Sequence, residues 1–387
     1  MSLSVLDVGA VRLPSMTQQL RREVRAFLDE ERAAGTVLGR PDSWLTGWDP
    51  AFTRRLAARG WVGMALPREY GGGGRGNLER YVVIEELLAA GAPVSAHWVA
   101  DRQAGPSILR HGTEEQRRRF LPRIAAGQCF FSIGMSEQNS GSDLASVQTR
   151  AERAGDGWRL SGTKMWTGGA HVNDYAIVLA RTDADEDPHA GLSQFIVDLR
   201  DPHLRVEPVR LLSGEHTFNR VHLDDVELGA DALLGRPGDG WQQVTGELAL
   251  ERSGPERFLS TLPLLTALVG QLRRTACGPD QHAGVGRLTA RLASIRQLSL
   301  GVAAALEAGR PADVQAALVK DLGTRFEGEL VDEVRRILPV TARFDTTRGT
   351  FPELLATAIL HAPGYTLRGG TNEILRGIIT RGLELSS

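Results

Sequence analysis

The chain has 387 residues, of which 42% are hydrophobic, enough to bury a large core and to suggest more than one domain. Its formal net charge of -2 gives no basic footprint for nucleic acid or for an anionic membrane surface. The two cysteines, Cys129 and Cys277, have no paired spacing, which argues against a disulfide framework and against a zinc site. No signal segment and no run apolar enough to span a bilayer is visible, so we expect a cytoplasmic protein.

The first third of the chain, from about Thr17 to Ile124, is predicted to be mostly helical because its apolar residues recur at helical spacing. Thr113 and Gln116 predict a capping box, since the threonine hydroxyl can accept the Gln116 amide while the glutamine side chain reaches back. A glycine-rich loop over 67–74 separates two of the predicted helices.

Over 129–240 the pattern changes to short apolar or alternating segments divided by turn residues. These segments lie at 158–160, 175–180, 194–197 and 220–223. Strands at this spacing suggest a small barrel or sandwich. Long helical periodicities then return through Leu338, and two shorter ones follow around Leu354 and Ile374. The predicted order is therefore helices, strands and a helical bundle.

Two polar segments, 133–143 and 162–168, are the first candidates for chemistry. They offer hydroxyls, free amides and the indole of Trp166 at predicted strand ends. A flat, electron-poor heterocycle needs such donors at its oxygens and ring nitrogen, with an aromatic wall that excludes water. The alternative is a polar loop with Asx-type turns over 136–143 and a core role for Trp166.

A glycine-rich run near the C-terminus, Arg368 to Ile374, is the second candidate. Two adjacent glycines let the backbone approach a ligand closely, and the amides of a helix start can face a phosphate or carbonyl oxygen. The alternative is an ordinary turn before a last helix.

At this spacing, the segments 133–143 and 162–168 resemble the flavin-binding signature of the acyl-CoA dehydrogenase family. Further matches run along nearly the whole chain, at Gly60-Trp61 with Pro67, Glu69, Tyr70 and Gly71, at Gly112 to Gln116 with Phe120-Leu121-Pro122, at Arg220 to Leu228, and at Gly370 to Ile374. The resemblance implies an α+β fold with an N-terminal helical domain over 1–128, a β-barrel over 129–240 and a C-terminal four-helix bundle over 241–387. It places FAD between barrel and bundle.

The resemblance also implies which residues surround the flavin ring. Ile133, Met135 and Ser136 correspond to positions that line the isoalloxazine. Trp166 and Thr167 correspond to positions that cover the ring and bond near its N5 atom.

Other positions correspond to the phosphate side of the cofactor and to the substrate. Gly141 and Ser142 match residues that approach the diphosphate and the pantetheine arm of the thioester. Thr371 and Glu373 match contacts on the diphosphate side. Arg274 matches an arginine that reaches the FAD of a neighbouring subunit.

Two usual family features are missing from the sequence. The aromatic residue of the family's Arg-x-x-Phe-Gly stretch is replaced by Cys277, and a glycine-rich loop that begins with glutamine is replaced by 343–349. Both departures concern the adenine end of FAD and the oligomer, so the way in which the adenine half is held stays open.

The family removes a proton from the α carbon of an acyl thioester and transfers a hydride from the β carbon to flavin N5. One carboxylate must act as the base. The thioester oxygen must be hydrogen-bonded as enolate charge develops, and in the family one backbone amide takes part. Many members carry the base immediately before Gly-Thr in the terminal loop, where this chain has Gly369. Gly369 cannot abstract a proton, but its amide can bond the thioester oxygen.

A subset of the family, the isovaleryl and long-chain types, carries its base on a bundle helix. By this resemblance Glu251 is the predicted base, with Glu247 as the fallback, and Arg252 positions the thioester or balances charge. The alternative is that Glu251, Arg252 and Glu256 form a solvated ion-pair cluster on a helix surface.

Three functional hypotheses remain. The leading one is an acyl-CoA dehydrogenase that passes electrons to an electron-transfer flavoprotein and forms a homodimer or homotetramer. The second is a biosynthetic dehydrogenase for an acyl group on a carrier protein. The third is a catalytically silent flavin-binding subunit that supports an active partner. Acyl chain length and branching stay open in all three.

Overall fold

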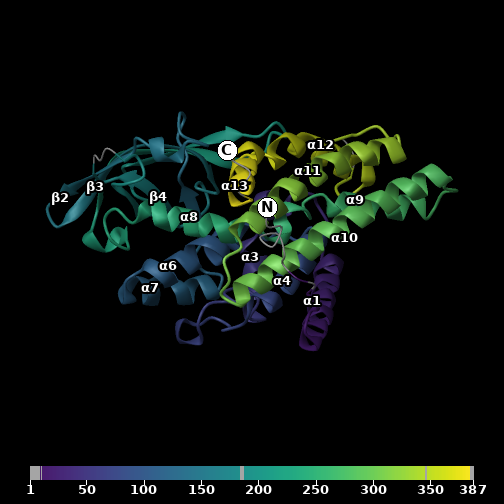
Figure 1. Ribbon diagram of the computed structural model, residues 1–387, viewed down its shortest axis with the longest axis horizontal. Helices are drawn as coiled ribbons and strands as arrows, with labels where there is room; N and C mark the ends of the chain where they lie inside the picture. Colours follow the sequence, from purple (N-terminus) through teal and green to yellow (C-terminus); the bar gives the residue numbers. More distant parts are fainter. Residues whose placement is uncertain (1–8, 10, 184–186, 345–346, 384–387) are drawn as a thin grey trace. The chain divides into compact units, whose positions relative to one another are not determined.

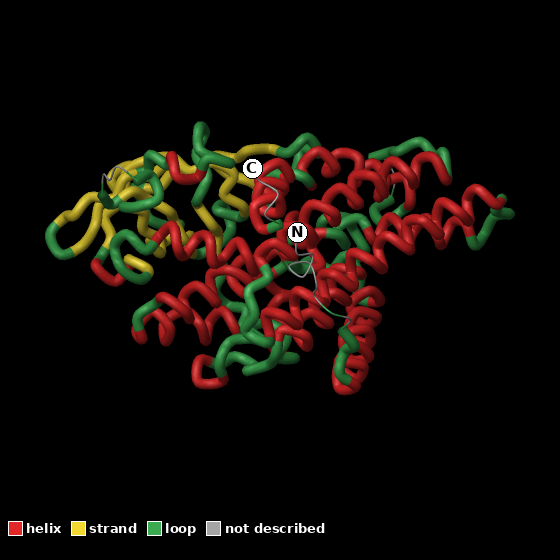
Figure 2. Tube along the Cα trace, viewed as in Figure 1, coloured by secondary structure: helices red, strands yellow, loops and turns green. Residues whose placement is uncertain are grey.

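The computed structural model describes residues 9, 11–183, 187–344 and 347–383, and the side chains of residues 247–251 lie outside the described part. The chain divides into two compact units, one of 1–47, 76–94 and 249–387 and the other of 48–75 and 95–248. Along the chain, helices come first, strands follow and helices return, as predicted (Figures 1 and 2).

The unit of 48–75 and 95–248 contains an eight-stranded sheet of order β6-β7-β3-β2-β4-β5-β8, with β1 pairing in parallel with β4. The strands are β1 (Phe131–Gly134), β2 (Arg150–Ala154), β3 (Gly157–Gly168), β4 (Tyr175–Arg181), β5 (Leu192–Asp198), β6 (Leu204–Arg210), β7 (His216–Leu228) and β8 (Leu233–Leu234). In β4 and β5 every residue but the last is buried. Such continuous burial is typical of strands covered on both faces.

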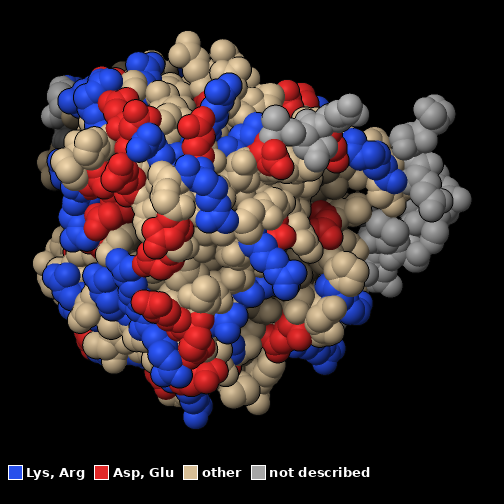
Figure 3. Space-filling model, turned by 90° about the vertical axis from the view of Figure 1, so that its left-hand side faces the viewer, with Lys and Arg blue, Asp and Glu red and all other residues tan. Residues whose placement is uncertain are grey.

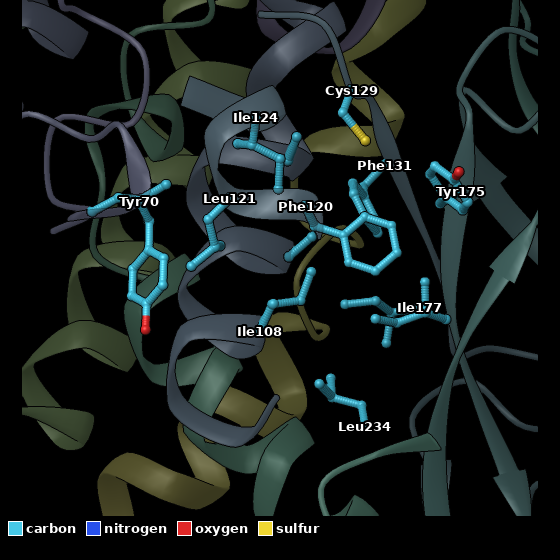
Figure 4. Close-up of a cluster of buried hydrophobic side chains, with 14 residues drawn as sticks. Tyr70, Ile108, Phe120, Leu121, Ile124, Cys129, Phe131, Tyr175, Ile177 and Leu234 are labelled. Carbon is cyan, nitrogen blue, oxygen red and sulfur yellow. The ribbon is translucent and has the colours of Figure 1, made fainter. Parts of the chain in front are cut away.

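Helices of the same unit cover the sheet. They are α3 (Pro50–Ala58), α5 (Ser95–Val99), α6 (Gly105–His111), α7 (Glu114–Ala125) and α8 (Gly240–Glu251), whose last residues pass into the other unit. Phe120 of α7 packs edge-on against Phe131 of β1 and Tyr175 of β4 (Figure 4). The predicted capping box is confirmed, because Thr113 Oγ1 accepts the Gln116 amide at 3.2 Å and Gln116 Oε1 accepts the Thr113 amide at 2.9 Å.

In the other unit, all regular elements of the described part are helices. Its helices are α1 (Ser15–Ala33), α2 (Ser43–Thr46), α4 (Asn77–Ala89), α9 (Leu262–Leu272), α10 (Pro279–Glu307), α11 (Asp313–Ile337), α12 (Phe351–Tyr365) and α13 (Asn372–Gly382). Helix α11 packs against α10, α12 and α13, and α4 packs against α1 and α10. Glu85 of α4 is buried and binds Arg21 of α1 and Arg296 of α10, so one carboxylate joins three helices.

None of the described helices combines the length and the apolar composition that crossing a membrane requires. On the face shown in Figure 3, basic and acidic side chains lie side by side. This interspersed pattern agrees with the near-neutral net charge of the whole chain.

A buried ion pair connects the N-terminal segment to the C-terminal loop within the helical unit. Arg368 Nη1 donates to both carboxylate oxygens of Asp42, at 2.9 and 2.8 Å, and His361 Nδ1 lies 3.0 Å from Asp42 Oδ2. The Arg368 guanidinium also lies over the rings of Trp44 and Tyr365. Burial raises the pKa of Asp42, but Arg368 and His361 outweigh burial and lower this pKa to about 2.

We predict that Asp42→Asn lowers the free energy of unfolding by about 3 kcal/mol at pH 7, because it leaves a buried guanidinium without its counter-charge. The folded-state pKa of Asp42 lies below its ordinary value of 3.8. The stabilisation is therefore present above pH ~4 and is lost as the pH falls from ~4 to ~2. Urea unfolding across this pH range measures both effects.

The matched control is Asp29→Asn, which removes an exposed pair with Arg32 on one helix and should change stability by less than about 0.5 kcal/mol. Equal losses in the two variants would show that the buried pair carries no special stabilisation.

Candidate functional site

Strand β1 and the loop after it carry the residues expected to line a heterocycle. Ile133 is partly buried and packs against the cluster between the sheet and its helices, and Met135 packs against a second buried cluster. The Ser136 carbonyl accepts a hydrogen bond from the Met165 amide of β3 at 2.8 Å. The loop is therefore bonded to the strand that carries the second polar segment.

A buried ion pair between Lys164 and Glu137 holds this loop. Lys164 Nζ lies 2.8 Å from Glu137 Oε1 and donates to the Met135 carbonyl at 3.0 Å. Glu137 also accepts the amides of Gln148 and Thr149, at 2.7 and 2.9 Å. Burial lowers the pKa of Lys164 to about 8, although Glu137 opposes this shift. Burial raises the pKa of Glu137, but the charge of Lys164 outweighs it, so this pKa is lowered.

Trp166 has an unusual backbone conformation for a bulky residue. Its φ of 59° lies in the left-handed region, at a point where the pairing of β3 with β7 shifts register. The side chain is 54% exposed, and its ring packs edge-on against Phe218 at 5.9 Å. An exposed indole held by a strained backbone is suited to form the wall of a site for a flat ligand.

The next residue, Thr167, is buried, and its hydroxyl has no hydrogen-bond partner among the described residues. Buried hydroxyls are normally satisfied, so this one can serve a ligand. Asn219 donates to the Thr167 carbonyl at 3.0 Å and also contacts the imidazoles of His171 and His216, which stack on each other. Burial, and then the neighbouring His216, lower the pKa of His171, which favours the neutral ring that accepts from Asn219.

The terminal loop between α12 and α13 is held by a second buried lysine. Lys320 of α11 donates to the carbonyls of Thr366 and Gly370, at 3.1 and 2.6 Å, and to Oδ1 of Asn372 at 2.8 Å. Gly369 and Gly370 have φ values of 70° and 89°. Any other residue would be strained in this backbone, so the two glycines are required by the loop geometry.

Guanidinium groups lie beside both glycines. A Cβ added to Gly369 would lie 2.7 Å from Nη2 of Arg257, and one added to Gly370 would lie 3.6 Å from Nη2 of Arg252. Arg257 is only 2% exposed, so its position is fixed by packing. The Arg257 guanidinium therefore occupies the place where a side chain at position 369 would begin.

Thr371 and Glu373 lie at the start of α13. Thr371 precedes the first helical residue, and Glu373 lies in the first turn. The pKa of Glu373 is lowered by a backbone amide and then by the Thr371 hydroxyl. A helix start that stabilises one carboxylate presents the groups that stabilise other anions, including phosphate.

The predicted base lies at the end of α8. Glu251 is the last residue of this helix, but its side chain and that of Glu247 lie outside the described part of the structure. Their roles stay predictions. Arg252, the next residue, is partly buried and is brought close to Gly370, as described above.

Three further predicted residues are exposed. Gly141 and Ser142 lie in the loop after β1, and a Cβ on Gly141 would meet open space. Arg274 lies exposed in the segment between α9 and α10. Their expected contacts with a diphosphate, a pantetheine arm and a neighbouring FAD stay predictions.

Several residues that shape the site were missed by sequence reasoning, namely Glu137, Lys164, Asn219, Arg257 and Lys320. Their partners are distant in sequence, so spacing does not reveal them. One signal was available, because Lys164 and Lys320 are the only lysines among 45 basic residues.

The unit that contains the sheet offers an aromatic wall, an unpartnered hydroxyl and amides beside one loop, which suit a planar cofactor. The helical unit offers a glycine loop next to cations, which suits a ligand oxygen that gains negative charge. The described residues contain no cluster of three or more His, Cys, Asp or Glu placed to bind a metal ion.

Comparison with known families gives matches over most of the chain. Residues 15–128 match the acyl-CoA dehydrogenase N-terminal domain, 132–226 the middle domain and 273–384 the C-terminal domain. The acyl-CoA dehydrogenase IpdE1 of Mycobacterium tuberculosis (strain ATCC 25618 / H37Rv) is 34% identical over 378 residues, which cover 94% of this chain and 96% of that protein.

Solved structures give a consistent result. The Tcur3481-Tcur3483 steroid ACAD has a TM-score of 0.87 and 28% identity, and the match covers 98% of this chain and 99% of that one. The ChsE4-ChsE5 complex from Mycobacterium tuberculosis has a TM-score of 0.83 and 26% identity, with 98% and 100% covered. The chain therefore belongs to the acyl-CoA dehydrogenase family and has its helical N-terminal, β-sheet middle and helical C-terminal architecture.

Proposed function

We propose that the protein is an FAD-dependent dehydrogenase that introduces a double bond between the α and β carbons of an acyl-CoA. Bound FAD supplies the acceptor for the hydride that leaves the β carbon. The observation that carries the proposal is the geometry of the terminal loop in this chain. Its glycines adopt left-handed backbone conformations, and the Arg257 guanidinium lies where a loop side chain would begin.

The residues around β3 fit a flavin ring. The unpartnered hydroxyl of Thr167 can bond a polar atom of the ring, and the exposed indole of Trp166 can cover it. Ile133 lies in β1, and Met135 and Ser136 belong to the loop that follows it, which is bonded to β3. An apolar and aromatic lining with a few placed donors is what an isoalloxazine requires.

We propose that Glu251 is the base that removes the α-proton. A carboxylate that takes this proton must work with groups that stabilise the negative charge developing on the thioester oxygen. In this chain the Gly369 amide is the proposed donor to that oxygen. Arg252 and Arg257 lie beside the loop and add a positive potential there.

A related structure adds a second class of substrate to the proposal. A neighbour at 28% identity is described as a steroid ACAD, so an acyl-CoA with a bulky, polycyclic acyl group joins linear acyl-CoAs as a proposed substrate. An acyl group on a carrier protein is the alternative. In each case an electron-transfer flavoprotein is the proposed electron acceptor.

Assembly with a different subunit is a second candidate role. A related structure at 26% identity is a complex of two differently named chains, ChsE4 and ChsE5. We propose that this chain forms either a homo-oligomer or a hetero-oligomer in which it binds flavin. The mass of the purified protein, alone and with a candidate partner, separates these two arrangements.

Anaerobic titration tests the proposed reaction. Purified protein should release FAD on denaturation, and an oxidisable acyl-CoA should bleach the visible band of the bound flavin. Bleaching by acyl-carrier protein alone would favour the carrier alternative. Protein that carries no flavin and binds none when FAD is added would contradict the proposal.

We predict that Glu251→Gln keeps the flavin but slows its reduction by acyl-CoA by roughly 10²–10⁴-fold, because the amide cannot take the α-proton. Stopped-flow absorbance measures this step directly. Glu247→Gln is the matched control, one helical turn earlier, and should reduce at a rate close to that of the wild type. The opposite pattern would move the base to Glu247.

We predict that Gly369→Glu does not restore reduction in the Glu251→Gln background. The new side chain would begin 2.7 Å from Arg257 Nη2 in a left-handed backbone, so the acid would pair with that guanidinium and lose basicity. Recovery of substrate reduction in the double variant would show that the loop still accommodates a base.

The same geometry predicts that Gly369→Ala destabilises the protein by about 1–3 kcal/mol. Gly286→Ala is the control, because Gly286 lies within α10 with open space around its Cβ position, and alanine should stabilise a helix there by about 0.5–1 kcal/mol. Thermal unfolding of both variants measures the difference in sign.

A further inference from the structure

Both lysines of the chain are fully buried, and both bind backbone carbonyls of a candidate ligand loop. All other residues among the 45 basic ones are arginine. Lys164 and Lys320 are each 0% exposed. Lysine is rarely buried in this way because burial disfavours the charged ammonium, so each site must offer compensating hydrogen bonds.

The acceptors around Lys320 match the ammonium group closely. Three oxygens from three residues, Thr366, Gly370 and Asn372, lie within 3.1 Å of one nitrogen. An ammonium carries three protons and can serve all three, whereas a guanidinium is a planar fork suited to paired oxygens. The site is therefore shaped for lysine and not for the arginine used elsewhere.

The bond to Gly370 sets the direction of the following amide. A peptide group is planar, and in its trans form the carbonyl and the amide hydrogen point in opposite directions. Because the Gly370 carbonyl points at Lys320, the Thr371 amide points away from it, at the start of α13. The bond to Thr366 holds the beginning of the same loop.

Lys164 acts on the loop after β1 in the same way. Its bond to the Met135 carbonyl turns the Ser136 amide away from the lysine. Glu137 neutralises the ammonium and is itself fixed by the Gln148 and Thr149 amides. The orientation of the Ser136 amide is therefore set by buried groups and not by solvent.

We propose that Lys164 and Lys320 are positioning residues, each of which uses a buried ammonium to turn one loop amide toward the bound flavin or thioester. Lys164 orients the Ser136 amide, and Lys320 orients the Thr371 amide and holds the start of the loop that carries Gly369. The assignment of ligands to these loops rests on the proposed function. The orientation of the loops by the lysines does not.

Lys320→Met tests the terminal loop, with Arg325→Met as the control. Arg325 lies on the same helix and pairs with Asp321. In Lys320→Met, the backbone amides of a peptide covering 366–372 should exchange hydrogen at least ~10-fold faster than in the wild type. In Arg325→Met their exchange rate should be unchanged. At saturating acyl-CoA, the rate of reduction per bound flavin should also fall at least ~10-fold in Lys320→Met, while KM should change less.

Lys164→Met tests the loop after β1, with Arg159→Met as the control. Arg159 lies on the same strand, exposed, and pairs with Glu227. The Kd of apoprotein for FAD, measured by flavin fluorescence, should rise at least ~10-fold in Lys164→Met and stay unchanged in Arg159→Met. The visible absorbance maximum of the bound flavin should shift only in the lysine variant.

Lys320→Gln and Lys164→Gln, which keep an uncharged donor, replace the methionine variants if those fail to fold, and should give smaller changes in the same direction. Wild-type exchange in 366–372, together with wild-type FAD affinity, in the lysine variants would overturn the proposal. If instead no acyl thioester reduces the wild-type flavin, the proposed function fails, while the exchange and FAD-affinity measurements still test the two lysines.

Discussion

A carbonyl that points at a buried cation fixes the direction of the amide that follows it, and both candidate ligand loops depend on this constraint. Lys164 holds the Met135 carbonyl, and Lys320 holds those of Thr366 and Gly370. Loops normally gain order from their own turns or from strand pairing. Here a side chain from a rigid strand or helix adds to those bonds and directs one amide of each loop, that of Ser136 or Thr371, away from the lysine.

The charged groups near the terminal loop are the second feature on which the candidate site depends. Arg252, Arg257 and Lys320 lie against its glycines, whereas the nearby acids do not all carry charge. Asp42 is ionised, because its pKa is lowered to about 2 despite burial. Burial raises the pKa of Glu327 to about 8, which favours its protonated form. The cations next to the glycines suit a thioester oxygen that becomes an enolate.

Local patterns in the sequence predicted local structure well. The Thr113 capping box needs only residues three apart, and it is confirmed. The change from helical to alternating periodicity near residue 129 likewise predicted the order of helices and strands. The contacts that shape the candidate site join residues far apart in sequence, such as Asp42 with Arg368. A single sequence contains no direct record of such pairs. The left-handed backbone of Trp166 also contradicts the preference of its residue type.

The surroundings of Gly369 limit which mutations could place a functional acid in the terminal loop. Glycine and glutamate codons differ by one base, so an acid at this position is only one mutation away. That mutation would place a strained side chain against the guanidinium of Arg257, and an acid paired with arginine makes a weak base. A functional loop acid would require a second change at position 257, whose side chain is packed beneath the loop. The two residues thus form a mutational barrier that keeps the loop free of an acid.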